Sequence, residues 1–201
     1  MCALFLSPSV VLALVPNDPQ LNLKGGVESL QLPQAWDITQ GSSDVIVAVI
    51  DAGVDISNSD LTENIWLNPK EQSDGVDNDG NGLIDDVRGW NFVKNNGDVR
   101  PIAAAGETSR IGLNHGSVIA GIIGAVGNNG VGGAGVNWRV KILPLKILDE
   151  RGEGDTDLAV KAIDYAIQKK ASIINLSFVG PTPSLDFIQA VRRAYRAGIL
   201  V

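Results

Sequence analysis

Short apolar runs alternate with helix-like segments from residue 45 onward, and this order constrains the fold more than any other feature. The runs are rich in β-branched residues and bounded by turn residues, which is typical of strands buried on both faces of a parallel sheet. They are VIVAVI at 45–50, VKILPLKIL at 140–148, SIINLS at 172–177 and ILV at 199–201. We therefore predict an α/β fold in which a parallel sheet carries helices on both faces.

Three segments between these runs have the sequence pattern of helices. Residues 115–127 are small and apolar and end at a glycine, which indicates a closely packed helix. Residues 155–170 carry an apolar stripe at helical spacing, which predicts a second helix. Asp155 or Thr156 can be its N-cap, and Lys169 and Lys170 close its last turn. In 184–198, Ser184 is placed to begin a helix and Gly198 to end it.

Composition and charge exclude several classes of partner. The chain has 201 residues and a net charge of -7 without a basic stripe, so we expect no nucleic-acid partner. Its single cysteine permits no disulfide within the chain. No apolar run reaches the roughly 18 residues of a membrane span. The N-terminal stretch MCALFLSPSVVLALVP has no basic residue before its apolar run, which makes it a poor secretory signal. We predict a leading segment over 1–43, followed by one domain over 44–201.

Two residues that can carry chemistry lie at the ends of predicted elements. Asp51 directly follows the strand at 45–50, and functional sites gather at the carboxyl ends of parallel strands. His115, the only histidine, stands at the predicted start of a helix. Each also has a plain structural interpretation, Asp51 as a turn residue that caps its own backbone and His115 as an ordinary surface or core histidine. Taken singly, neither residue decides between these alternatives.

Together the two residues form a more specific pattern. The segments VIVAVIDAGVD and HGSVIAG, in this order and with LPQAWDITQGSSD, GWNF and IINLSF around them, resemble the subtilisin-like serine peptidases, the subtilases. The resemblance extends from about VPNDP to Val201. It implies that 44–201 form an incomplete peptidase domain of subtilisin-like fold. It also implies a serine endopeptidase that hydrolyses polypeptides.

The resemblance implies a role for each residue of the pair. Asp51 accepts a hydrogen bond from Nδ1–H of His115, which fixes the tautomer and stabilises the imidazolium. Nε2 of His115 takes the proton from a serine hydroxyl as that serine attacks a peptide carbonyl. Ala52 and Ser117 stand where the family usually has threonine. Neither position does the chemistry, so both departures are mild.

The resemblance also implies two segments that contact the substrate. One segment matches the wall of the pocket for the side chain before the scissile bond, and the other matches the edge strand that pairs with the substrate backbone. The first consists of Ser177, Phe178 and Val179, and the second of Gly152, Glu153 and Gly154. Val179 stands where the family usually has glycine, and its branched side chain is expected to narrow the groove.

The nucleophile of such a triad is absent from the sequence. In the family it lies in a Gly-Thr-Ser motif far downstream, preceded by an asparagine of the oxyanion hole, and neither segment occurs within these 201 residues. Ser117 adjoins His115, but at a helix start we expect its side chain to point away from the reacting carbon. We therefore expect a fragment, inactive alone, whose partner is its own C-terminal part beyond Val201, because AGILV stops inside an apolar strand. The alternative is a truncated, non-catalytic protein that binds calcium or peptide.

An Asp-rich loop predicts a calcium site. DNDGNGLIDD at 77–86 places oxygen donors at alternate positions, as in the first half of an EF-hand loop. The predicted ligands are Asp77, Asp79, Asn81, the Leu83 carbonyl, Asp85 and Asp86. The loop is not a complete EF-hand, because Arg88 stands at the twelfth position. The alternative is a solvated acidic turn.

A second calcium site is implied by the resemblance alone. In the family, an aspartate soon after the catalytic one shares a structural calcium ion with the loop after the histidine helix. Asp60 and Asn129 match those positions. Ca²⁺ is thus the one cofactor that we expect. The family and the calcium loop together favour an extracellular or secreted location.

Overall fold

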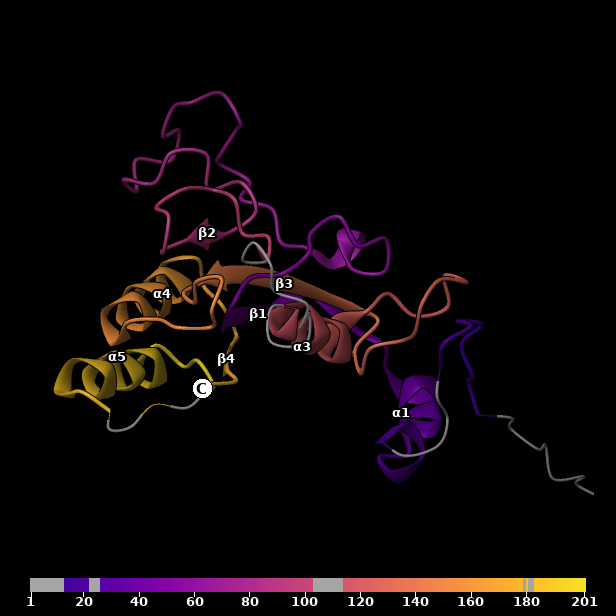
Figure 1. Ribbon diagram of the computed structural model, residues 1–201. Coiled ribbons are helices and arrows are strands. Elements are labelled where there is room, and N and C mark those ends of the chain that lie inside the picture. Colours follow the sequence, from indigo (N-terminus) through magenta and orange to yellow (C-terminus); the bar gives the residue numbers. More distant parts are fainter. Residues whose placement is uncertain (1–12, 22–25, 103–113, 179, 181–182) are drawn as a thin grey trace, which may run out of the picture.

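Four parallel strands form one sheet in the computed structural model, which describes residues 13–21, 26–102, 114–178, 180 and 183–201 (Figure 1). The spatial order is β2-β3-β1-β4. The strands are β1 (Gly41–Asp51), β2 (Trp90–Asn91), β3 (Arg139–Lys146) and β4 (Ile173–Leu176). The predicted ILV strand contributes one parallel bridge, from Leu200 to Ile173. The predicted parallel α/β sheet is therefore confirmed.

Helices cover both faces of the sheet, because the side chains of its strands alternate. Val47 and Val49 of β1 pack in a core with Ala120 of α3 (His115–Gly124). Ala48 and Ile50 point to the opposite face, into the larger core. That core also receives α4 (Thr156–Gln168) and α5 (Leu185–Arg196). In Figure 1, α4 and α5 accordingly lie side by side at one end of the sheet.

The helix ends follow the sequence signals. The Asp155 side chain accepts the Asp157 N–H at 3.1 Å and caps α4. The Ser184 hydroxyl accepts the Phe187 N–H at 3.2 Å and caps α5. Past the end of α5, Gly198 has a φ of 79°, the left-handed conformation that glycine adopts without strain.

One helix was not predicted. The segment LPQAWDI forms α1 (Leu32–Ile38), ahead of a short 3₁₀ turn, η2 (Thr62–Asn64). Trp36 packs against Trp138 with ring centroids 5.1 Å apart, and its indole N–H donates to the Val136 carbonyl at 2.9 Å. A helix of 7 residues is marginal in isolation, so these tertiary contacts stabilise it.

A proline lies inside the sheet without interrupting it. Pro144 pairs with Val49 of β1 and is buried in the middle of β3. On the other side of β3, pairing with β2 begins only at Leu145. Gly89, just before β2, approaches so closely that an added Cβ would lie 2.0 Å from the Pro144 carbonyl oxygen. Pro144 has no backbone N–H to donate, and it lies at a position of β3 that precedes the hydrogen bonds to β2, so no bond of the sheet is lost.

The helices are short. The longest helix in the described part of the chain, α4, has 13 residues. A membrane span needs about 20 apolar residues. Accordingly, none of the described helices is long and apolar enough to cross a membrane.

Candidate active site

Asp51 and His115, far apart in the sequence, form a hydrogen-bonded pair. Asp51 ends β1, is 1% exposed, and accepts the Ala52 N–H on Oδ1 at 2.7 Å. Its other oxygen, Oδ2, lies 2.8 Å from Nδ1 of His115, the first residue of α3. The imidazole keeps 42% of its side-chain surface exposed. The carboxylate is therefore buried behind a histidine that solvent can reach.

The close approach of α3 to β1 depends on a glycine. A Cβ on Gly116 would lie 2.3 Å from the Gly53 carbonyl oxygen and 3.0 Å from Cβ of Asp51. Only a residue without a side chain lets the helix start this near the loop after β1. The distance between Asp51 and His115 is thus set by backbone packing as well as by their own hydrogen bond.

We predict that Gly116→Ala destabilises the protein, although alanine is the better helix former. The added methyl group displaces Asp51 or the Gly53 carbonyl, and overpacking of this kind costs about 1–3 kcal/mol of the free energy of unfolding. Gly121→Ala in the same helix is the matched control, because a Cβ there meets nothing within 4 Å. It should stabilise by about 0.5–1 kcal/mol. Urea unfolding of both variants measures the difference, and equal effects would contradict this packing.

Hydrogen bonds from β3 and α3 fix the loop after Asp51. The Ile147 N–H donates to the Asp51 carbonyl at 2.9 Å, and the buried Lys146 ammonium donates to the Ala52 carbonyl. Burial lowers the pKa of Lys146, and the nearby charge of Lys94 adds to this effect. Ser117 accepts the N–H of Asp55 at 2.9 Å, so its hydroxyl holds the loop. The sequence analysis missed Lys146, because a lysine at the end of a strand carries no signal of its own.

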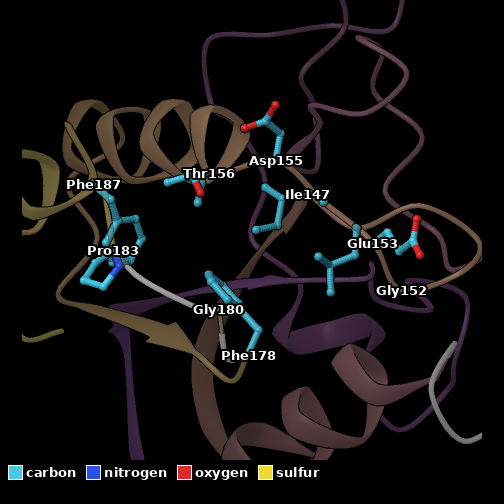
Figure 2. Close-up of a pocket in the computed structure, with 12 residues that line it drawn as sticks. Ile147, Gly152, Glu153, Asp155, Thr156, Phe178, Gly180, Pro183 and Phe187 are labelled. Carbon is cyan, nitrogen blue, oxygen red and sulfur yellow. The ribbon is translucent and has the colours of Figure 1, made fainter. Parts of the chain in front are cut away.

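The predicted substrate segments converge on one pocket of about 450 Å³ (Figure 2). Gly152, Glu153, Gly154 and Phe178 all line it. The remaining wall combines the apolar residues Ile147, Leu148, Ala159, Pro183 and Phe187 with the polar residues Asp155 and Thr156. Of the other predicted residues, Ser177 accepts a hydrogen bond from Asn175 at 2.8 Å, and Val179 lies outside the described residues.

Comparison with known proteins identifies the family. A model described as the subtilase family matches residues 42–201. The chain belongs to the subtilase family. Its relatives include proteins named subtilisin-like protease 1 and thermitase.

Three relatives illustrate the similarity. Subtilisin-like protease 1 of Plasmodium berghei (strain Anka) is 39% identical over 188 residues, which are 92% of this chain and 30% of that protein. Thermitase of Thermoactinomyces vulgaris is 33% identical over 92% of this chain and 56% of its own length. Halolysin-like extracellular serine protease Nep of Natrialba magadii is 29% identical over 81% of this chain and 26% of its own. The subtilase chain therefore spans between a quarter and somewhat over half of these proteins.

Three carboxylates, two of them on buried residues, form a second cluster. Each of Glu71, Asp79 and Asp86 offers an oxygen, and these oxygens lie within 4.8 Å of one another. Asp86 is fully buried and Glu71 is 6% exposed. Oε2 of Glu71 has no hydrogen-bond partner in the described part of the chain. Oxygens bound at 2.3–2.6 Å to one Ca²⁺ lie at most about 5 Å apart, so the spacing of these three oxygens fits part of the six to eight ligands that this ion takes.

The six ligands predicted in the loop fall into two groups, those in the carboxylate cluster and those that bond within the loop. Asp79 and Asp86 belong to the cluster, and the Asn81 amide donates to Asp86 at 2.7 Å. Asp77 instead accepts three successive backbone N–H groups of its own loop, and Asp85 accepts two from the preceding turn. The prediction for Leu83 concerned its carbonyl, whereas the hydrogen bond that the structure shows comes from its N–H, which donates to the Asn81 side chain at 2.7 Å. Asp77 and Asp85 therefore shape the loop that carries the cluster.

Residues that the sequence analysis missed complete the cluster. Glu71 is one of them, and Asn68 donates to both Asp79 and Asp86. Burial raises the pKa of Asp79, but hydrogen bonds from Asn68 and Lys169 outweigh it and hold that pKa below its usual value. Burial and the hydrogen bond to Asp86 raise the pKa of Tyr165, so its hydroxyl stays a donor. No periodic sequence pattern connects these residues.

The two residues implied for a second calcium site also meet. Asp60 is 8% exposed and accepts the Asn129 amide at 3.0 Å and the Gly133 N–H at 2.9 Å. Asp18, which the sequence analysis missed, lies beside them and accepts the N–H groups of Asn128 and Asn129 at 2.7 and 3.1 Å. Two buried carboxylates thus hold the loop after α3.

Proposed function

We propose that this chain supplies the general base and the orienting carboxylate of a serine endopeptidase, acting on a serine outside these 201 residues. The observation that carries the proposal is the 2.8 Å contact between buried Asp51 and accessible His115. The match to the subtilase family over residues 42–201 supports the same class of reaction.

The chemistry follows from the protonation of the pair. An ionised carboxylate only accepts hydrogen bonds, so the Asp51 contact requires the proton on Nδ1 of His115. Nε2 then has a free lone pair and takes the proton of the serine hydroxyl during attack on the peptide carbonyl. Asp51 stabilises the resulting imidazolium, which next protonates the leaving amine.

We propose that the pocket in Figure 2 receives an apolar side chain of the polypeptide substrate. Gly152, Glu153 and Gly154 form one rim and can pair with the substrate backbone as an added strand. Phe178 and Phe187 provide apolar surface inside. Burial of an aromatic or branched side chain there removes apolar area from water, which favours such substrates.

A peptide series should reveal this preference. The polypeptide expressed from its complete reading frame is tested with peptides in which the pocket-filling side chain of the best substrate is replaced by a smaller one. Each methylene group removed should lower kcat/KM about 10- to 200-fold. The same replacement at a substrate position outside the pocket is the control. Equal effects at all positions would contradict an apolar pocket that selects substrates.

We also propose that α3 packs against a further part of the polypeptide, such as the C-terminal part of the peptidase domain. Val118 and Ile122 are 56% and 58% exposed and lie four residues apart, hence on one face of the helix. An exposed apolar pair next to His115 is suited to contact the segment that brings the serine.

Calcium is the proposed cofactor, at the cluster of Glu71, Asp79 and Asp86. Oε2 of Glu71 is buried and has no hydrogen-bond partner among the described residues, which supports a cation there, because an unpaired buried charge is costly. A weaker second site is proposed at Asp60 and Asn129, with Asp18 as an additional carboxylate. When bound, calcium would stabilise the loops and take no part in peptide hydrolysis.

An extracellular location is proposed as well. Calcium-binding loops suit compartments where this ion is abundant, and one relative is named an extracellular serine protease. Fractionation of the native source, followed by detection with an antibody against residues 13–102, would test this. Recovery from the cytosolic fraction alone would contradict it.

Peptide hydrolysis tests the proposed function. The polypeptide expressed from its complete reading frame should hydrolyse a peptide library, and the 201-residue chain alone should not. Absence of hydrolysis from both, with calcium or peptide binding retained, would favour the non-catalytic alternative. Hydrolysis by the 201-residue chain alone would contradict the assignment of the nucleophile to another part.

A further inference from the structure

A buried lysine lies within the carboxylate cluster. Lys169 is at the C-terminal end of α4, and its side chain is 8% exposed. Its ammonium lies 2.6 Å from Oδ2 of Asp79 and 3.0 Å from Oδ2 of Asp86. The rings of Tyr165 and Trp66 lie 5.1 and 6.0 Å from the same nitrogen, within the range of cation–π attraction. The proposed peptidase chemistry gives this cation no role.

The charges of the cluster do not balance. Three carboxylates face one ammonium, while the remaining donors, Asn68, Asn81 and Tyr165, are neutral. The excess of negative charge amounts to one divalent cation. One of these two uncompensated charges belongs to Glu71, whose Oε1 accepts the Asn78 N–H while Oε2 has no partner among the described residues.

We infer that Lys169 is a resident counter-ion of the proposed calcium site. Its ammonium holds Asp79 and Asp86 together in the absence of calcium. It also weakens calcium binding, because a positive charge next to the ion is repelled most strongly where water is excluded. This inference rests on the proposed calcium site and adds that the chain tunes the affinity of that site through one side chain of α4.

The charge of Lys169 can be removed without shortening its side chain. Calcium titration calorimetry on the 201-residue chain should give a dissociation constant at least about tenfold lower for Lys169→Met than for the wild type. In excess EGTA, the same variant should melt at a lower temperature than the wild type. Lys170→Met is the matched control, because Lys170 is the exposed neighbour. It should change the dissociation constant less than about twofold.

A second variant covers the case in which Lys169→Met does not fold in EGTA. The double variant Glu71→Gln with Lys169→Met removes one charge of each sign. It should restore the melting transition in EGTA, and failure to restore it would overturn the inference. Equal calcium affinities of the wild type and a folded Lys169→Met would also overturn it. Absence of calcium binding in every variant would instead refute the calcium site itself, and the inference with it.

Discussion

Replacing His115 by alanine is expected to lower kcat roughly 10⁶-fold in the polypeptide expressed from its complete reading frame, the loss known for removal of the histidine in subtilisin. Asp51→Asn should lower it roughly 10⁴-fold, as the same replacement does in the chymotrypsin-type triad. Without the imidazole, no group takes the serine proton. With asparagine at position 51, the side chain can donate to Nδ1, which favours the wrong tautomer and leaves the imidazolium without its carboxylate. Single-turnover kinetics with a chromogenic peptide would measure both effects.

Ser117→Ala is the control for these two variants. Ser117 is two residues from His115, but its hydroxyl accepts the Asp55 N–H, so its loss removes about 1 kcal/mol of loop stability and no step of the chemistry. Its kcat should remain within about tenfold of the wild type. If His115→Ala retained a kcat as high as that of Ser117→Ala, the histidine would not be the base.

Calcium should raise the melting temperature of the 201-residue chain strongly. At a free concentration about a thousandfold above the dissociation constant, an ion that binds only the folded state adds about 4 kcal/mol. For a chain of this size, this corresponds to a rise of about 8 to 16 °C. Differential scanning calorimetry in calcium and in EGTA would measure it.

Variants identify the site responsible for that rise. Asp86→Asn removes a fully buried carboxylate of the cluster and should abolish most of the rise. Asp44→Asn is the control, because Asp44 is exposed and its side chain hydrogen-bonds only to Ser42 in the described structure. Equal calcium effects in both variants would show that calcium binds elsewhere.

Local patterns predict the sheet and most helices because these elements bury one-sided apolar surfaces. The continuous apolar run in β1 and the caps Asp155 and Ser184 are local signals, and the structure contains all of them. The helix α1 has a proline in its first turn but no side-chain cap, and it is only 7 residues long. It depends on Trp36 meeting Trp138 and the Val136 carbonyl, about a hundred positions away in the chain, and such contacts are not visible in a short window.

The same distinction applies to the sites. Asp51 and His115 can be predicted because each begins or ends a recognisable element and the two motifs resemble one family. Lys169 was interpreted as one of two lysines closing the last turn of a helix, whereas its ammonium reaches Asp79, 90 residues away. Glu71 lies in a turn-rich stretch without periodicity. Only the folded chain brings these charges together, so a sequence motif can predict the acidic loop without predicting its ligands.

A serine-directed fluorophosphonate probe tests the central claim most directly. The probe forms a covalent bond only with a serine that a neighbouring base activates, and peptide mapping identifies the labelled residue. In the polypeptide expressed from its complete reading frame, we expect one labelled serine outside residues 1–201, and no labelling in His115→Ala. Labelling that survives in His115→Ala, or a labelled serine within the 201 residues, would contradict the assignment of Asp51 and His115 as the carboxylate and base of the triad.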